Sequence, residues 1–125
     1  MSWQSYVETQ LIEKKLTQGA IAGLDGNIWA KSTDFNITPA EMKTILDNYE
    51  NSGTLATSGI NLAGTKFLYI SGNEEVLRGK KGKGGVHIMK TNQAVVVGVY
   101  DEPLSAPEAA TVTETLGSYL KTCGY

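Results

Sequence analysis

The sequence is poor in the side chains that catalytic and metal sites use. Its 125 residues include a single His, His87, and a single Cys, Cys123. One cysteine excludes an intramolecular disulfide, and neither a Cys and His cluster nor a carboxylate loop with calcium spacing is present. We therefore expect a protein that is not an enzyme and that needs no metal or cofactor.

The neighbours of these two residues favour structural roles. His87 alternates with Val86 and Ile88 in a predicted strand, where a place in the sheet is favoured over a role as catalytic base. Cys123 falls in the apolar stripe of the last predicted helix, where a small buried side chain is the default. Nothing in the sequence supports a catalytic pair of the two.

Long hydrophobic runs are also missing. No apolar run approaches the roughly 18 to 20 residues that cross a membrane. The start at Met1-Ser2-Trp3-Gln4 lacks the basic and apolar regions of a secretory signal. Hydrophobic residues make up 41% of the chain, which suits one globular domain over residues 1–125. We expect this domain in the cytoplasm.

The charge of the chain is small but unevenly placed. The net charge is −2 and the pI about 5.4, so we expect no nucleic-acid partner. Lys66 and Lys90 lie on predicted strands near a cluster that we expect to form a flexible basic hairpin end. Two interpretations stay open: a solvated turn that protects a sheet edge, or a surface that attracts an acidic protein or an anionic lipid. Four of the eleven basic residues fall within six positions of this cluster, at Arg78, Lys80, Lys81 and Lys83.

Three segments have the apolar period of helices. The first runs from residue 2 to about residue 13, and its aliphatic edge can face a core while its aromatic edge stays partly open. The second opens at Thr38-Pro39-Ala40-Glu41 as a capping box, and Asn51-Ser52-Gly53 stops it. The third opens at Ser105 with the same spacing of Ser and Glu. Its apolar arc contains Ala109, Val112, Leu116, Tyr119, Leu120 and Cys123.

Shorter patterns between the helices predict a sheet. Asp25-Gly26-Asn27 between two apolar runs is a strong hairpin signal, which places Trp29 on a strand. Because the gaps between the other predicted strands are short, only antiparallel pairing is sterically easy, and consecutive strands form a meander. With helices at both ends packed on one face, the fold class is an α+β sandwich. These strands are predicted at residues 60–62, 66–70, 75–77, 86–89 and 94–100, with turns at 63–64, 71–73, 82–85 and 91–93.

Both ends of the chain are aromatic. Trp3 and Tyr6 lie in the first six residues and Tyr119 and Tyr125 in the last seven, which is four of the ten aromatic residues (two Trp, six Tyr and two Phe). Chain termini usually fray, so these rings indicate that both ends are tied down and packed together. With Trp29 they would form one shallow surface that suits a polyproline II helix. The alternative is that they are ordinary core or rim residues.

One motif matches a known protein family more specifically than any other part of the sequence, namely the N-terminal Ser2-Trp3-Gln4-Ser5-Tyr6-Val7-Glu8. The chain resembles the profilin family of small actin-monomer-binding proteins over essentially its full length. The resemblance implies a central antiparallel sheet with the N- and C-terminal helices on one face and shorter helices on the other. Further matching motifs are Asp25-Gly26-Asn27-Ile28-Trp29-Ala30, Ile37-Thr38-Pro39-Ala40-Glu41, Gly79-Lys80-Lys81-Gly82, Ser118-Tyr119-Leu120 and Gly124-Tyr125.

The resemblance also implies what the protein binds. It implies one-to-one binding of monomeric actin to regulate polymerisation, and docking of proline-rich proteins such as formins and similar nucleation factors. Phosphatidylinositol bisphosphate is a further implied partner, and the cytoplasm and cytoskeleton are the implied location. The implied poly-proline-binding residues are Trp3, Tyr6, Trp29, Tyr119, Leu120 and Tyr125. The implied actin-binding residues are Lys66, Arg78, Lys80 and Lys90, and the phosphoinositide-binding ones are Arg78, Lys80, Lys81 and Lys83.

Some positions depart from the family pattern. Ser71 and Glu75 stand where many profilins carry Arg, and Glu74 with Glu75 would repel an anionic headgroup. Tyr119 stands where some profilins carry His, which implies a more apolar and less pH-sensitive groove. Two alternative functions are a membrane-signalling protein that mainly binds phosphoinositide and holds actin weakly, and a small sensor or enzyme domain with a buried ligand. The last leaves Trp3 and Tyr125 without a role.

Overall fold

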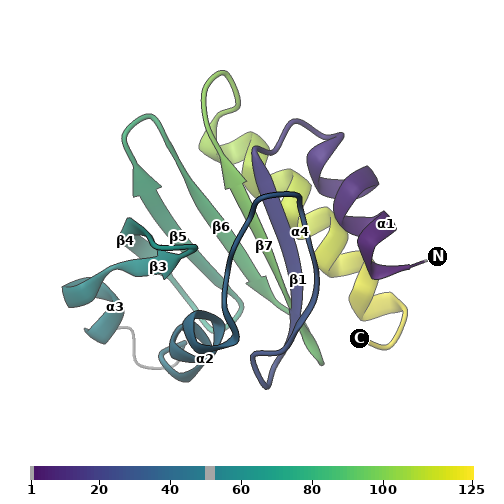
Figure 1. The fold of residues 1–125 in the computed structure, drawn as a ribbon, viewed down its shortest axis with the longest axis horizontal. Coiled ribbons are helices and arrows are strands. Elements are labelled where there is room, and N and C mark those ends of the chain that lie inside the picture. The colour runs from purple at the N-terminus through teal and green to yellow at the C-terminus, as the bar shows by residue number, and fades with distance from the viewer. Residues whose placement is uncertain (1, 50–52) are drawn as a thin grey trace.

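Seven strands form one antiparallel sheet in the part of the chain that the structure describes, residues 2–49 and 53–125 of a computed structural model (Figure 1). The elements in chain order are α1 (Trp3–Val7), the π-helical η1 (Glu8–Ile12), β1 (Gln18–Gly23), β2 (Ile28–Lys31), α2 (Pro39–Asp47), α3 (Gly53–Ser58), β3 (Ile60–Leu62), β4 (Thr65–Gly72), β5 (Val76–Lys81), β6 (Gly84–Lys90), β7 (Ala94–Tyr100) and α4 (Ala106–Thr122).

The strand order of the sheet is β2-β1-β7-β6-β5-β4-β3. The predicted meander is confirmed for β3 to β7, where each strand pairs with the next in the chain. The pairing of β1 with β7, in which Ile21 lies opposite Val96, joins the first hairpin to the last strand and was not predicted. It places Trp29 of β2 at one edge of the sheet, next to the helices from the two chain ends.

Helices cover both faces of the sheet, which confirms the α+β sandwich. On one face α1, η1 and α4 pack over β1, β2, β6 and β7, and on the other face α2 and α3 cover the sheet (Figure 1). Alternate residues of β7 therefore enter two cores. Val95 and Val97 belong to the core under α2 and α3, while Ala94 and Val96 belong to the core under α1, η1 and α4. Because both faces of β7 are buried, its sequence is continuously apolar and does not alternate with polar residues.

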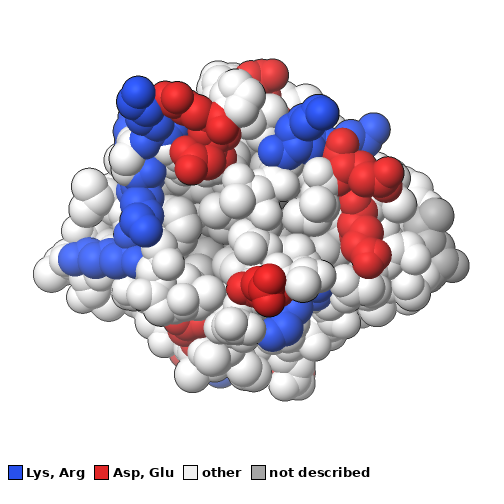
Figure 2. Space-filling view, turned by 45° about the horizontal axis from the view of Figure 1, so that its top comes forward, with Lys and Arg blue, Asp and Glu red and all other residues white. Residues whose placement is uncertain are grey.

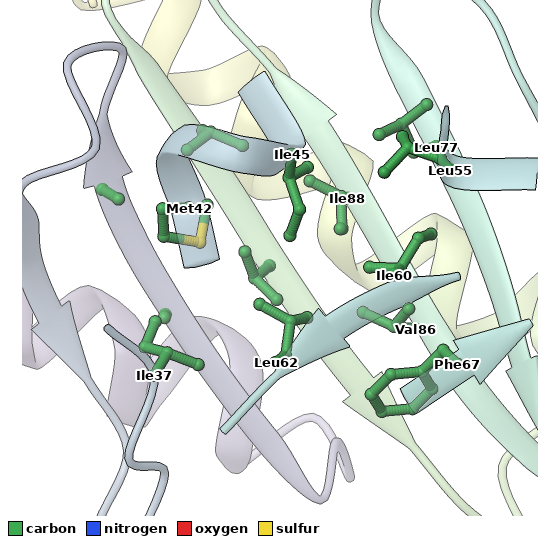
Figure 3. Close-up of a cluster of buried hydrophobic side chains, with 14 of the residues drawn as sticks. Ile37, Met42, Ile45, Leu55, Ile60, Leu62, Phe67, Leu77, Val86 and Ile88 are labelled. Carbon is green, nitrogen blue, oxygen red and sulfur yellow. The ribbon is translucent and has the colours of Figure 1, made fainter. Parts of the chain in front are cut away.

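The larger core lies under α2 and α3. Met42 and Ile45 of α2 and Leu55 of α3 point toward side chains of the sheet such as Leu77 and Ile88 (Figure 3). All five side chains are at most 1% exposed. The helix α2 begins as predicted, because the Thr38 side chain accepts from the Glu41 backbone N–H and the Glu41 carboxylate accepts from the Thr38 N–H.

Two glycines let α4 approach the sheet closely. A Cβ atom at Gly98 of β7 would lie 2.4 Å from Thr113 Oγ1, and one at Gly117 of α4 would lie 2.4 Å from Met89 Sδ. The capping box that was predicted at the start of this helix is present between Ser105 and Glu108. The position of α4, and with it that of Tyr119, is therefore set by both its cap and its packing.

The helices differ from the prediction in three details. The first helix is α-helical only to Val7 and continues as the π-helix η1. The second ends at Asp47, and two residues of its predicted stop, Asn51 and Ser52, lie outside the described residues. Gly53, the third, begins α3, which the sequence did not predict because Leu55 is its only buried residue and gives no period.

The strands β5 and β6 are longer than predicted. The basic cluster was expected in a flexible hairpin end, but Arg78, Lys80 and Lys81 lie on β5, and the turn contains only Gly82 and Lys83. The glycines that suggested a loop serve close backbone contacts instead: a Cβ atom at Gly85 would lie 2.3 Å from the Gly79 carbonyl oxygen. The same error shortened β4, which continues through Ser71 and Gly72.

Candidate ligand-binding groove

The helix α1 presents Trp3 and Tyr6 at one side of the sheet. Ser2 caps it, with its Oγ accepting from the Ser5 N–H at 3.1 Å. Gln4 Nε2 donates to the Lys31 carbonyl oxygen at 2.9 Å and so fixes the helix to β2. The aliphatic edge is fully buried, as predicted, while the two rings stay half-buried at the surface.

Trp29 of β2 lies beside Trp3, with their ring centroids 4.7 Å apart. A Cβ atom at Gly23 on the neighbouring strand would lie 3.0 Å from Trp29 Nε1, so the missing side chain leaves room for the indole. The hairpin signal at Asp25-Gly26-Asn27 thus placed Trp29 on a strand correctly, and the sheet brings it next to α1.

Tyr125 packs against Trp3 and Trp29 and forms with them one end of a groove. We use this name for the surface of five rings, Trp3, Tyr6, Trp29, Tyr119 and Tyr125. Its ring meets Trp3 edge-on at a centroid distance of 4.9 Å and Trp29 at 6.2 Å. The turn after α4 is a Schellman motif: the Tyr125 N–H donates to the Leu120 carbonyl at 2.9 Å, and the Gly124 N–H to the Lys121 carbonyl at 3.1 Å. Gly124 has a φ of +92°, a conformation that glycine adopts without strain. The two chain ends are packed together, as predicted.

Tyr119 and Tyr6 form the other end of the groove, with ring centroids 5.9 Å apart. Tyr119 is 49% exposed. Hydrogen bonds to Tyr6 and to Cys123 raise the pKa of Tyr119 to about 12, because ionisation would remove a donated proton. Leu120 is 1% exposed, so it supports the rings from below and does not reach the surface.

The five rings form one continuous aromatic surface. Trp3 contacts three of the others, and Tyr6 extends the row to Tyr119. A hollow that sequence reasoning missed continues from these two tyrosines between η1 and α4 and is also lined by Gln10, Thr115 and Leu116. The signal for the two polar residues was helical spacing, since Gln10 follows Tyr6 by four positions and Thr115 precedes Tyr119 by four.

The basic residues expected to meet actin do not all share one face. Arg78 lies directly opposite His87, whose side chain bonds to α4, and Lys80 lies two positions along on the same face. Lys66 of β4 shares this face because Leu68, two positions on, pairs with Lys80. Lys90 lies on the opposite face.

Lys90 is held against the larger core. It pairs with Val95, a residue of that core, and its Nζ lies 4.9 Å from the ring centroid of Tyr49. The sequence missed two exposed apolar residues on the other face, Leu68 and Ile70, which are 62% and 56% exposed. Their signal was the alternation with the buried Phe67 along β4.

The basic cluster is also divided. Lys81 faces away from Arg78 and Lys80, and Lys83 in the turn forms an ion pair with Glu102 at 3.2 Å. Figure 2 shows basic side chains in a run along one side of the molecule, with acidic side chains directly beside its upper end. Because of the register of β5 and the ion pair of Lys83, the four residues of the basic cluster do not present one uninterrupted positive surface.

Ser71 and Glu75, which depart from the family pattern, each bind the side chain of a basic residue. Arg78 Nη1 donates to Ser71 Oγ at 3.3 Å. Glu75 forms an ion pair with Lys121 of α4 at 3.2 Å. Ser71 thus connects β5 to β4, and Glu75 connects α4 to the turn between β4 and β5.

His87 is buried in the structure, whereas Cys123 is exposed. His87 is 2% exposed, and its Nε2 lies 2.7 Å from Glu114 Oε2. Burial lowers the pKa of His87, and the bond to Glu114 opposes that change. Its place in the sheet was predicted correctly. The prediction that Cys123 is buried is wrong: the helix α4 ends at Thr122, so Cys123 is its C-cap residue, lies beyond the apolar stripe and is exposed.

In residues 2–49 and 53–125, no helix has the length and apolar character needed to cross a bilayer.

The structure defines a class of protein: a small α+β sandwich whose two terminal helices lie together on one face and carry an aromatic groove. Comparison with known proteins names the family. The profilin family model matches residues 1–125, and the chain belongs to the profilin family.

The relatives are similar over their whole lengths. The chain is 50% identical to the profilin of Bombyx mori and 46% identical to that of Drosophila melanogaster, each over 100% of both chains. Among solved structures, Acanthamoeba castellanii profilin IB matches with a TM-score of 0.95 and 41% identity, covering 99% of this chain and 100% of that one. Mouse profilin IIa, in complex with a double repeat from the FH1 domain of mDia1, matches in fold alone, with a TM-score of 0.82, 20% identity and 100% coverage of both chains.

Proposed function

We propose that this protein binds monomeric actin one to one and regulates its polymerisation, while the aromatic groove docks proline-rich segments of partner proteins such as formins. It acts by binding and not by catalysis, in the cytoplasm and at the cytoskeleton. The observation that carries the proposal is the continuous row of five rings built from both chain ends and β2. Membership of the profilin family supports it, and the FH1 repeat bound to mouse profilin IIa makes a proline-rich segment the first ligand to test.

The groove suits a polyproline II helix for chemical reasons. That helix has no internal hydrogen bonds, so its carbonyl groups remain free to accept. The indole N–H groups of Trp3 and Trp29 and the phenol of Tyr125 are donors, and the rings offer flat faces for proline. Proline is already restricted in conformation, so binding costs little ordering entropy.

The face of β4 and β5 that α4 leaves uncovered is the surface we propose for actin. It combines the basic Lys66, Arg78 and Lys80 with the exposed apolar pair Leu68 and Ile70. A partly apolar patch with a charged rim is typical of protein interfaces. Lys90 lies on the opposite face, so we propose no contact for it at this surface.

The groove can be tested by titrating tryptophan fluorescence with a proline oligomer, since both tryptophans of the chain lie in it. We expect saturable binding to the wild type and a loss of about tenfold or more in affinity for Trp3→Ala. Tyr69→Ala, which removes a half-buried ring on β4 far from the groove, is the matched control and should bind as the wild type does. Equal binding by Trp3→Ala, or no fluorescence change in the wild type, would refute the groove.

We propose phosphoinositide binding as a secondary activity of Arg78, Lys80, Lys81 and Lys83. Because Lys83 is paired with Glu102 and Lys81 faces away from the other two, we expect the affinity for anionic lipid to be weak. Sedimentation with vesicles that contain phosphatidylinositol bisphosphate, compared with vesicles that contain only neutral lipid, tests this activity. Partitioning that does not depend on the anionic lipid would exclude it.

A further inference from the structure

The turn between β6 and β7 holds the aromatic end of the chain. Thr91 Oγ1 donates to the Tyr125 carbonyl oxygen at 2.8 Å, and the Gln93 backbone N–H donates to the same oxygen. Gln93 Nε2 donates to the Gly124 carbonyl oxygen at 3.1 Å. The last two residues are therefore bonded to a turn that precedes them by more than thirty positions, Tyr125 following Thr91 by 34.

The Thr91 side chain is built into this contact. It is only 7% exposed, and its Oγ1 accepts from the Ala94 N–H at 3.0 Å, which leaves the hydroxyl proton for a carbonyl acceptor. Of the two carbonyl oxygens in reach, that of Tyr125 at 2.8 Å is nearer than that of Ala94 at 3.1 Å. The Ala94 oxygen already accepts from the Thr91 N–H at 2.7 Å, so the turn does not need the hydroxyl to satisfy it.

These bonds matter because the Schellman motif alone leaves the end of the chain partly free. The motif fixes the Tyr125 N–H but not its carbonyl group. A residue that is held through its N–H alone keeps conformational freedom at its carbonyl end. Held on both sides, the Tyr125 ring stays edge-on to Trp3, the ring that contacts three of the others.

We propose that Thr91 and Gln93 are positioning residues for proline binding: they touch no ligand, and they act by holding Tyr125 in place. The inference rests on the proposed function of the groove. It extends the functional site to a turn outside the two terminal helices and β2, and it makes ligand affinity depend on a polar contact beneath the rings.

A double-mutant cycle tests the proposal, with affinity for a proline oligomer measured by tryptophan fluorescence. We expect Thr91→Val to weaken binding about fivefold, the effect of losing the bond that holds Tyr125, and Thr91→Ser to restore it. The variant also loses the bond from the Ala94 N–H, but that bond lies within the turn and is lost equally in both backgrounds. Gln93→Ala, which removes only the contact to Gly124, should weaken binding by about twofold to threefold. In a Tyr125→Ala background, Thr91→Val should cause no further loss, because the ring that it positions is gone.

Thr111→Val is the matched control, since it removes the hydroxyl of an exposed threonine on α4 that, in the part of the chain that the structure describes, bonds only within its own helix. It should bind as the wild type does. Near-ultraviolet circular dichroism gives a second measurement: Thr91→Val should weaken the signal of the coupled rings in the absence of ligand, while Thr111→Val should not.

The outcomes separate this inference from the function on which it rests. If Tyr125→Ala binds as tightly as the wild type, the proposed groove itself is refuted. If Tyr125→Ala weakens binding but Thr91→Val weakens it equally in both backgrounds, the positioning role is overturned while the groove stands. A Thr91→Val variant that binds as the wild type does also overturns it, whatever its melting temperature.

Discussion

At the scale of single residues, the fold treats two threonines of α4 differently. The Thr111 hydroxyl is exposed and donates to the Pro107 carbonyl oxygen at 3.0 Å. The Thr113 hydroxyl is fully buried beside Gly98, and within the described residues it has no hydrogen-bond partner. A buried hydroxyl without a partner costs free energy that its polar character does not return.

We therefore expect Thr113→Val to stabilise the protein. Valine has nearly the shape of threonine and a similar helix propensity, so the change removes the unpaired oxygen and keeps the packing. The free energy of unfolding in urea should rise by about 1 kcal/mol. Thr111→Val should change it by less than about 0.5 kcal/mol, and a loss of stability in Thr113→Val would show that the hydroxyl has a partner after all.

His87 makes stability depend on pH. Burial lowers its pKa in the folded protein, against the bond to Glu114, and Arg78 nearby lowers it further. Below about pH 6.5 the imidazole of the unfolded chain binds a proton that the folded protein does not yet bind. The unfolding free energy should thus be highest above this pH and should fall as the pH decreases from there toward the folded pKa.

Urea denaturation at a series of pH values between about 5 and 8 measures this effect, and His87 is the only histidine of the chain. In His87→Gln the curve should be flatter, because no imidazole titrates, even though the mean stability is lower. Equal slopes for the two proteins would mean that His87 binds its proton alike in both states.

At the scale of elements, two helices open with the same capping box but in different surroundings. Within the described residues, Glu108 of α4 accepts from Ser105 alone, through the Ser105 N–H and hydroxyl. Glu41 of α2 accepts from Thr38 and in addition from the Ala63 and Gly64 backbone N–H groups, at 2.9 and 3.1 Å. One carboxylate thus holds both a helix start and the turn that leads into β4.

We expect Glu41→Ala to be the more costly of the two matched changes. It should lower the free energy of unfolding by about 2 kcal/mol, since it leaves three backbone donors without their acceptor. Glu108→Ala should cause a clearly smaller loss, because water can replace the carboxylate at an exposed helix start. Urea denaturation of both variants decides the matter, and equal losses would show that the contacts to the β3–β4 turn contribute nothing.

The helices and strands also show which parts of the fold could be predicted from the sequence. Capping boxes, the Asp-Gly hairpin and period-2 alternation are local signals, and each predicted an element that the structure contains. The pairing of β1 with β7 has no local signal, and the glycines of β5 and β6 looked like loop because their close backbone contacts exist only in the sheet. In the candidate site, four of the five rings followed from their place at the two chain ends and Trp29 from the hairpin signal, whereas the face of Lys90 depends on strand register and was not predicted.

At the scale of the whole molecule, the two proposed surfaces lie apart on one sheet. Trp29 stands on β2 at one edge, while Arg78 and Lys66 stand on β5 and β4, four and five strands along the order. A peptide in the groove and actin on β4 and β5 would then touch no common residue. Mutations at separate sites that share no partners have additive effects.

We expect the two ligands to bind together and to be lost separately. Trp3→Ala should weaken binding of a proline oligomer about tenfold or more and leave the affinity for monomeric actin within about twofold. Arg78→Glu, which reverses a charge among the exposed side chains of the other surface, should do the opposite. Titrating each variant with each ligand, and the wild type with proline oligomer at saturating actin, measures all the affinities needed. Competition between the ligands in the wild type would mean that the surfaces overlap, and the groove and the uncovered face of β4 and β5 would then have to be treated as one site.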